Sequence, residues 1–295
     1  MMEYSMLKAI GKGLITFLPG VAELLDNRKK KSRHSSSNAE FAYSLWLSVL
    51  VFLKENNIEA NLNRIGEIGN GGSLGVAFCA ILAGSQRYYD LEFYDNINVS
   101  EQLRLLEKIA LLFQNKTPIR KYDSINIKIK NYDFPVDYVL PDREQTILIE
   151  QLRRDIVQGF TNSRLIRIID NWESAPSLAL DFVFSRAVME HVKNPSEVYA
   201  SIYNHLKNNS YMLHDIELHS HGVSKQIDGH LQIKPFWWRL IVGKRPFLMN
   251  RWSFGVHLDE VKKQGFLPVI MDRVMKLDNG SLREAEYGAV MLAKV

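Results

Sequence analysis

Hydrophobic positions along the chain follow two periodicities, one typical of strands and one typical of helices. Apolar or alternating runs of strand length lie at residues 62–69, 84–92, 165–170, 178–185 and 211–216. Helical spacing covers residues 39–56, 99–114, 144–158, 196–207 and 258–264. The two kinds of run alternate, and this order predicts an α/β fold with a mostly parallel sheet and helices on both of its faces.

The same pattern divides the chain into parts. Residues 1–60 predict a helical N-terminal arm, and residues 61–295 predict the main domain. An irregular insertion at about 115–163 interrupts that domain, and selectivity for a substrate is expected there. The last two strand-like runs, 266–277 and 287–295, flank Asn279-Gly280 and indicate a hairpin.

A glycine-rich turn, Gly69-Asn70-Gly71-Gly72, follows the first strand. Glycine lets the backbone turn sharply and lets a ligand approach it closely. Ser73 starts the next helix and can cap its first N–H groups. A strand, a glycine loop and a helix in this order are typical of a cradle for a nucleotide-like cofactor. A plain tight turn has the same composition, so the flanking residues must decide.

Acidic residues stand at informative distances from the loop. Glu67 precedes the first glycine by two positions, and Glu92 ends the second strand about 20 residues beyond the loop. An acid there accepts hydrogen bonds from ribose hydroxyls, and Asp90 and Asp95 are neighbouring alternatives. A dinucleotide site usually has glycine or alanine three residues after its second glycine, where this chain has Leu74. The fit to an NAD site is therefore imperfect, whereas the acid at the end of the second strand supports a nucleoside cofactor of either kind.

The fourth strand runs into a second motif. Asp181-Phe-Val-Phe-Ser185 is followed by Met189-Glu190-His191-Val192 and then by Pro195. This segment is similar to the fourth-strand motif of the type 11 and type 12 methyltransferase families. Together with the loop and Glu92 it covers about 130 residues, and the chain resembles the class I S-adenosylmethionine-dependent methyltransferases. Leu180 stands where those families usually have an aromatic residue, and the gap before the fourth strand is longer than theirs.

The resemblance implies a Rossmann-like, doubly wound sheet whose last strand is inserted antiparallel, and it implies S-adenosylmethionine as the cofactor. Asp170 is assigned to the adenine amino group by strand order alone, with Glu173 as the alternative. The residues expected to bind the cofactor are Glu67, Gly69, Asn70, Gly71, Ser73, Glu92, Asp170 and Ser185. The expected acceptor is a small molecule or a sugar or glycan, as in methyltransferases of surface-polysaccharide biosynthesis.

Residues 214–221 concentrate three histidines and two acids just after the fifth strand. Histidines and acids bind metals, but no second group with metal-ligand spacing occurs elsewhere in the chain, so no metal is expected. By the resemblance, this segment faces the acceptor, and the residues assigned to acceptor binding are His214, Glu217 and Arg251.

Methyl transfer to a hydroxyl or an amine benefits from a base that titrates near neutral pH, which suits histidine. His221 and His191 are the candidate bases, and Glu190 and Glu217 are the candidate acids that orient them. His191 can equally serve as a cap for the backbone that follows the strand. Methyl transfer is otherwise a matter of positioning, because the sulfonium already activates the methyl group.

Composition and charge narrow the remaining choices. The 295 residues, 46% of them hydrophobic, are enough for a sizeable core, and a net charge of +4 does not by itself indicate a nucleic acid partner. The single cysteine, Cys79, lies in an apolar helix and excludes an internal disulfide, so a cytoplasmic location is the default.

Two segments leave open a contact with a membrane. Residues 14–25 are too short to span a bilayer, and with the basic run at 28–33 they either pack on the domain or touch a membrane surface. Residues 235–254 mix aromatic and basic side chains, which suits a helix on the core, a lid over an anionic acceptor, a surface that stacks on bases, or a membrane contact.

Three other functions stay open on the sequence. An NAD-dependent oxidoreductase is disfavoured by Leu74 and by the motif at residues 181–195. A catalytically inactive scaffold that binds the cofactor would keep the same loop. A nucleic-acid methyltransferase is disfavoured because the fourth strand lacks an Asn/Asp-Pro-Pro-aromatic motif.

Overall fold

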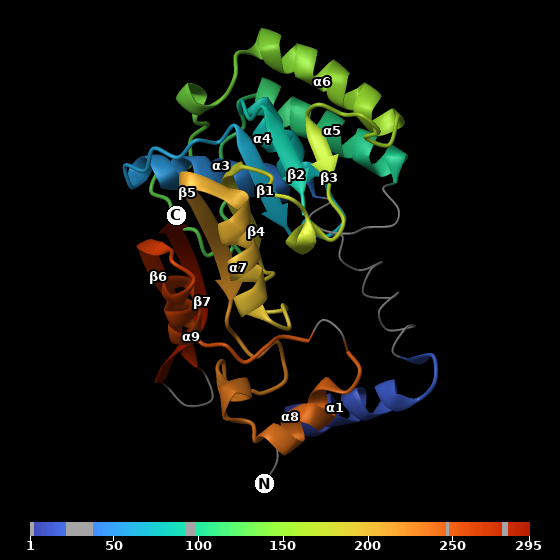
Figure 1. Ribbon diagram of the computed structural model, residues 1–295, viewed down its shortest axis with the longest axis vertical. Coiled ribbons are helices and arrows are strands. Elements are labelled where there is room, and N and C mark those ends of the chain that lie inside the picture. Colours follow the sequence, from blue (N-terminus) through green and yellow to red (C-terminus); the bar gives the residue numbers. More distant parts are fainter. Residues whose placement is uncertain (1–2, 22–37, 92–97, 246–247, 279–282) are drawn as a thin grey trace. The chain divides into compact units, whose positions relative to one another are not determined.

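The computed structural model of the chain describes residues 3–21, 38–91, 98–245, 248–278 and 283–295 (Figure 1). In these residues seven strands form one sheet, in the order β3-β2-β1-β4-β5-β7-β6. The strands are β1 Arg64–Ile68, β2 Arg87–Asp90, β3 Ile166–Ile168, β4 Leu180–Arg186, β5 Leu206–Glu217, β6 Leu267–Asp278 and β7 Arg283–Lys294.

The strands β1 to β4 are parallel. β1 lies between β2 and β4, with Glu67 opposite Asp90 and Ile68 opposite Ser185, and β2 pairs with β3. Because these strands run the same way, their carboxyl ends meet at one edge of the sheet. The residues that follow β1, β2 and β3 therefore leave the sheet along this edge.

The strand β7 runs against its neighbours. The N–H of Leu218 donates to Tyr287 O (2.8 Å), and the N–H of Val295 donates to Ser210 O (3.0 Å), so residue numbers rise along β5 as they fall along β7. Residues 279–282 join β6 to β7, and such a short link permits only an antiparallel pair. The predicted fold, a mostly parallel Rossmann-like sheet with an antiparallel C-terminal strand, is confirmed.

Helices alternate with the strands as expected. The α-helices are α1 Tyr4–Leu14, α3 Ala39–Glu55, α4 Gly75–Leu82, α5 Val99–Gln114, α6 Asp142–Val157, α7 Pro195–His205, α8 Pro235–Val242 and α9 Phe254–Lys263. The 3-10 turns are η1 Ile15–Phe17, η3 Val136–Tyr138, η4 Trp172–Ser174 and η5 Gly229–Gln232. None of the helices in the described part of the chain is both long enough and apolar enough to cross a membrane.

Several predicted boundaries need correction. The third strand was expected over residues 165–170, but β3 has only three residues, and Asp170 lies beyond it. β5 begins at Leu206 rather than at 211, directly after α7. The helix after the glycine loop begins at Gly75, so Ser73 lies before it instead of starting it.

The chain forms two compact units, which we name by the candidate residues they contain. The loop unit comprises Arg33–Ser185, Ser201–Leu213 and Lys294–Val295. The histidine unit comprises Met1–Ser32, Arg186–Ala200 and His214–Ala293. The predicted division into an arm of residues 1–60 and a domain of residues 61–295 stays a prediction.

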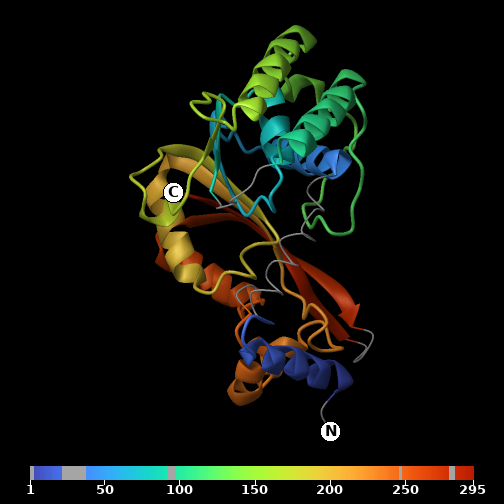
Figure 2. The same ribbon diagram turned by 90° about the vertical axis from the view of Figure 1, so that its right-hand side faces the viewer.

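The helix α3 lies in the centre of the core of the loop unit. This helix is apolar on nearly every side, so it is buried along most of its length instead of along one stripe. It packs against α4 and α5, and these in turn contact α6, beside β1 to β3 (Figure 2). The Asn38 side chain caps α3 by accepting from the N–H of Glu40 (3.0 Å).

The histidine unit has its own apolar cluster, where α1 lies against α8 (Figure 1). Ala9 and Ile10 of α1 and Ile241 of α8 are buried there with Val223 and Ile233. The two helices touch at a glycine, because a Cβ on Gly13 would lie only 1.9 Å from Leu240 O. For the segment at residues 235–254, α8 thus fits the interpretation as a helix packed on a core.

Candidate functional site

The glycine loop adopts the backbone that its sequence predicts. Gly69, Gly71 and Gly72 all have positive φ angles, of 78°, 67° and 82°. Residues with a Cβ rarely adopt this conformation, so three such positions in four residues require glycine. The loop leaves the carboxyl end of β1, where ligands bind in open α/β sheets.

Asn70 ties this loop to the neighbouring strand. Its Nδ2 donates to Asp90 Oδ2 (2.6 Å), and its Oδ1 accepts from the N–H of Gly72 (2.7 Å). Both side chains are buried. Asp90, which the sequence presents only as an alternative to Glu92, is therefore an anchor of the loop. Glu92 lies outside the described residues, and its ribose contact stays a prediction.

Glu67 is buried next to the loop, on β1. The Tyr88 hydroxyl donates to Glu67 Oε2 (2.5 Å) from the adjacent strand. Burial, followed by the negative charge of Glu67, raises the pKa of Tyr88 well above its ordinary value, so the phenol keeps the proton that it donates. The Glu67 carboxylate is thus fixed beside the loop by a donor that sequence reasoning did not identify.

The remaining cofactor candidates differ in their settings. Ser73 Oγ accepts from the N–H of Gly75 (3.3 Å), while the N-cap residue of α4 is the buried Leu74. Ser185 is fully buried in β4, opposite Ile68. Asp170 is exposed after β3. The loop, Glu67 and Ser185 therefore gather around the carboxyl end of β1, and Asp170 follows a strand further along the sheet.

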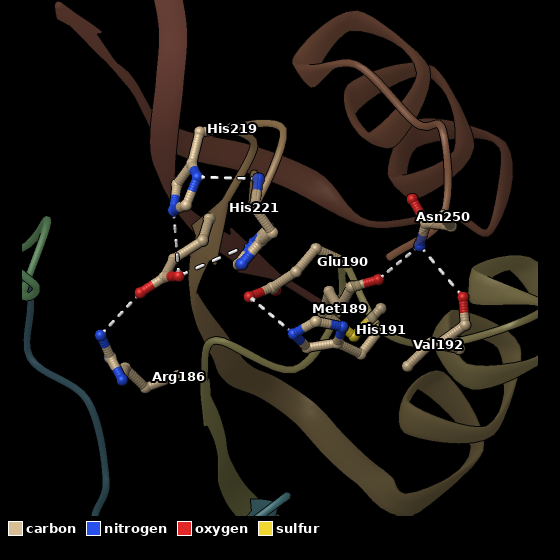
Figure 3. A network of polar contacts seen from close by, with 9 residues as sticks. Arg186, Met189, Glu190, His191, Val192, His219, His221 and Asn250 are labelled. Carbon is tan, nitrogen blue, oxygen red and sulfur yellow. Dashed lines mark hydrogen bonds and ion pairs between the residues drawn. The ribbon is translucent and has the colours of Figure 1, made fainter. Parts of the chain in front are cut away.

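A second constellation lies in the histidine unit and is drawn in Figure 3. We call it the histidine cluster, and its members are Glu190, His191, Glu217, His219 and His221. They come from the connection after β4 and from the end of β5 and the residues that follow it. In each of two groups, Glu190–His191–His221 and Glu217–His219–His221, one ligand atom per residue lies within 4.8 Å of the others.

Glu217 is the charged anchor of this cluster. Its Oε1 accepts from Arg186 Nη2 (2.8 Å), and its Oε2 lies 3.4 Å from His219 Nε2 and 3.8 Å from His221 Nε2. Burial raises the pKa of the Glu217 carboxyl, but the hydrogen bond with His219 and the charge of Arg186 outweigh it. The pKa therefore lies below its ordinary value, and Glu217 is ionised at neutral pH.

His221 is held in place by its own backbone. It has a φ of 46°, which is uncommon for a residue with a Cβ, and its N–H donates to His219 Nδ1 (3.2 Å). The two rings stack with centroids 4.0 Å apart. Burial and the neighbouring histidines lower the pKa of His221 to about 4, so its imidazole is neutral at pH 7 and has a lone pair.

Glu190 contrasts with Glu217. Its side chain is buried, and neither carboxylate oxygen has a hydrogen-bond partner among the described residues. Burial, together with the charges of Glu217 and Asp215, raises the pKa of Glu190 well above its ordinary value. His191 Nε2 lies 4.0 Å from Glu190 Oε1. In the absence of a cation, this carboxyl therefore favours its protonated form.

Asn250 fixes the segment that carries Glu190 and His191. Its Nδ2 donates to Met189 O (2.7 Å) and Val192 O (3.0 Å), as Figure 3 shows. Its backbone N–H donates to Glu190 O. Sequence reasoning did not select this asparagine as a site residue, since the residues it binds lie about sixty positions away. It likewise did not select Arg186 or His219 as site residues.

Two predicted acceptor residues lie outside the cluster. His214 is fully buried against the Tyr199 ring, and burial lowers its pKa to about 3. Arg251 Nη2 donates to Leu231 O, and its guanidinium lies 5.5 Å from the Trp238 ring. These contacts favour a structural role for His214 and show that Arg251 supports the turn η5.

Comparison with known proteins gives matches in structure only. No protein-family model matches the sequence, and no curated protein matches it. A methyltransferase solved with the Haloferax volcanii Trm112 activator is similar over 90% of this chain and 94% of its own, at 11% identity and a TM-score of 0.46. An S-adenosylmethionine-dependent methyltransferase of Mesorhizobium loti is similar over 82% of this chain and 95% of its own, at 9% identity and a TM-score of 0.44.

A third similar structure comes from Burkholderia thailandensis. It is 1,6-didemethyltoxoflavin-N1-methyltransferase with its small-molecule ligand and S-adenosylhomocysteine bound. The similarity covers 100% of this chain and 91% of the other, at 10% identity and a TM-score of 0.41. Because all three scores are below 0.5, we base the functional proposals on this chain's own residues.

Proposed function

We propose that this chain is a methyltransferase that uses S-adenosylmethionine as its cofactor. The observation that carries the proposal is the loop at the carboxyl end of β1, with three positive-φ glycines and the buried link from Asn70 to Asp90. A backbone without side chains allows a nucleoside cofactor to approach closely. The antiparallel β7 supports the same choice, because it is the strand that class I methyltransferases insert.

The structure disfavours an NAD site at the same loop. In a dinucleotide fold, a third glycine or alanine allows helix and strand to pack closely. Here that position is Leu74, whose side chain is buried and whose N–H donates to Gln102 Oε1 (3.2 Å). A buried leucine at the start of α4 takes up the space that a small residue would leave open.

We assign the acceptor to the histidine cluster. In the proposed reaction an oxygen or nitrogen of the acceptor attacks the methyl carbon, and the C–S bond breaks with its electron pair staying on sulfur. The acceptor's proton passes to His221 or His191, with Glu190 and Glu217 beside them. A neutral imidazole is needed for this step, and His221 is neutral at pH 7. Its pKa of about 4 also makes it a weaker base than a histidine that titrates near neutral pH, so positioning carries more of the catalysis.

The acceptor class follows from the resemblance of residues 214–221 to methyltransferases of sugar and polysaccharide biosynthesis. A small molecule or a sugar or glycan with a free hydroxyl or amine is therefore the proposed substrate. Mass spectrometry of products from a panel of such acceptors tests this assignment. Cofactor binding without any methylated product would instead favour the inactive scaffold.

The cofactor is tested by calorimetric titration with S-adenosylhomocysteine and, separately, with NAD, in buffer that contains a metal chelator. We expect micromolar binding of S-adenosylhomocysteine and none of NAD. Gly71→Val should abolish this binding, because it places a β-branched side chain at a φ of 67°. Gly159→Val is the matched control, since Gly159 has a φ of 61° but lies after α6. Binding of NAD alone would overturn the proposal.

We also propose a peripheral membrane contact through the N-terminal segment. Tyr4, Leu7, Leu14, Phe17 and Leu18 are 47–76% exposed along α1 and the turn that follows it. Lys8 and Lys12 are exposed on the same helix and suit an anionic lipid surface. The protein should sediment together with anionic vesicles, and Leu14→Glu should lower the fraction that does so. Equal fractions for the two proteins would refute the contact.

A further inference from the structure

The Glu190 carboxylate is the least satisfied group in the histidine cluster. It is 3% exposed, and neither oxygen accepts a hydrogen bond from any residue that the structure describes. A buried carboxylate without hydrogen bonds is costly unless it takes up a proton or meets a cation. No lysine or arginine forms an ion pair with it in the described part of the chain. The groups that face it are Glu217 and Asp215, which repel its charge, Arg186, which favours it, and the two histidines His191 and His221.

Two imidazoles converge on this carboxylate from different segments. Ligand nitrogens of His191 and His221 and an oxygen of Glu190 all lie within 4.8 Å of one another, and the two rings are 5.3 Å apart. Asn250 fixes the backbone on one side, through Met189, Glu190 and Val192. On the other side, the left-handed backbone conformation of His221 sets the direction of the chain after β5. The convergence is therefore built by the fold.

We propose that Glu190, His191 and His221 bind one divalent transition-metal ion, with Zn²⁺ as the best match. Two histidines and one glutamate are the donor set of catalytic zinc sites, which leave a fourth position open. Atoms that bind one ion at about 2.1 Å lie up to about 4 Å apart, so small side-chain rotations close the site. His191 and His221 are partly exposed, which gives an ion a route to Glu190.

The other group, Glu217, His219 and His221, is a weaker choice for the ion. Glu217 already accepts from Arg186 (2.8 Å), and that positive charge opposes a second cation. His219 Nδ1 accepts from the N–H of His221, so its other nitrogen carries the proton that faces Glu217. In the proposed site, Glu217 Oε2 stays close to His221 Nε2 (3.8 Å) and adds negative charge beside the ion.

This inference does not rest on the cofactor, because the ligands all belong to the histidine unit. It does change how the proposed acceptor is activated. A divalent ion lowers the pKa of a bound hydroxyl or water, so an ion at this site would perform the task otherwise given to the histidine base. The proposal of S-adenosylmethionine as methyl donor stands with or without the ion.

The test is a titration of the chelator-treated, full-length protein with Co²⁺, followed by visible absorption, without cofactor or acceptor. We expect saturation at one Co²⁺ per chain and displacement by Zn²⁺ but not by Mg²⁺, which prefers oxygen ligands. Glu190→Gln and His191→Ala should each weaken Co²⁺ binding at least tenfold. His257→Gln, which removes a buried histidine outside the cluster, should leave it unchanged.

Glu190→Gln keeps the shape of the side chain and removes its buried acid, so it should fold as the parent does, and circular dichroism checks this. The rise in melting temperature that Zn²⁺ gives the parent should be lost in this variant. Stoichiometric binding that both variants retain would place the ion elsewhere and overturn the proposal. Absence of saturable binding to the parent would also overturn it, and would leave His221 or His191 as the base. Neither result would bear on the titration with S-adenosylhomocysteine.

Discussion

The buried His257 should make the stability of this protein fall as the pH is lowered. Its side chain is fully buried, and its Nδ1 is hydrogen-bonded to the Tyr199 hydroxyl (2.9 Å). Its Nε2 has no hydrogen-bond partner within the described ranges of the chain. Burial lowers its pKa from 6.5 to about 3. In the unfolded chain the imidazole takes up a proton below about pH 6.5, whereas in the folded chain it stays neutral.

The sign and the magnitude follow from this difference. Between pH 6.5 and pH 3 the unfolded state binds more protons, so the free energy of unfolding decreases as the pH falls. Each pKa unit corresponds to about 1.4 kcal/mol, and the linkage gives a loss of about 2 kcal/mol from His257 between pH 7 and pH 5. His214, whose pKa is also lowered to about 3, adds a similar loss.

Urea unfolding at pH 7 and at pH 5, followed by tryptophan fluorescence, measures this loss. His257→Gln retains a polar group for Tyr199 but does not titrate, so its loss between the two pH values should be smaller than the parent's by about 2 kcal/mol. Val256→Ala, at a 44% exposed position in the same helix, should keep the parent's pH dependence. If the parent and His257→Gln lose equal stability, burial does not keep His257 neutral and the reasoning is wrong.

Three further predictions concern other contacts. Gly13→Ala should destabilise the packing of α1 on α8 by about 1–3 kcal/mol, since its Cβ would meet Leu240 O. Gly11→Ala should not, because no described residue outside its own surroundings in α1 comes within 4 Å of the added Cβ. Hydrogen exchange of the α1 amides distinguishes the two variants. Tyr88→Phe removes the donor to Glu67 and should cost about 1.5–3 kcal/mol in urea unfolding, and an unchanged midpoint would contradict this. Asn70→Ala should weaken the binding of S-adenosylhomocysteine at least tenfold in calorimetry. An unaltered affinity would show that the loop does not need its link to Asp90.

The fold could be predicted because its signals are local. The apolar runs that became β1, β4 and β5 stand out by their length and content, and three glycines in one turn require positive φ. The third strand was overestimated because an apolar run records burial, whereas a strand lasts only as long as its neighbour pairs with it. β3 pairs with β2 over three residues and then ends.

The candidate site could be predicted only in part, because its contacts depend on register and on long loops. Asp90 was only a secondary candidate until the register of β1 and β2 placed it opposite Glu67, with its side chain on Asn70. The histidines of residues 214–221 could be recognised in the sequence. Their contact with Glu190 depends on the paths of two connections, the one after β4 and the one after β5. Nothing local in the sequence marks Asn250 as the residue that holds one of these connections.

Asn250 has a wider consequence. It belongs to the stretch between α8 and α9, yet it binds backbone atoms on both sides of Glu190 and His191. Evolution can therefore tune the chemistry of this cluster without replacing any of its five members, through the length and composition of a remote connection. Sequence comparison restricted to the histidines and glutamates would miss such changes, and variants with altered activity should be sought in the stretch that leads into α9.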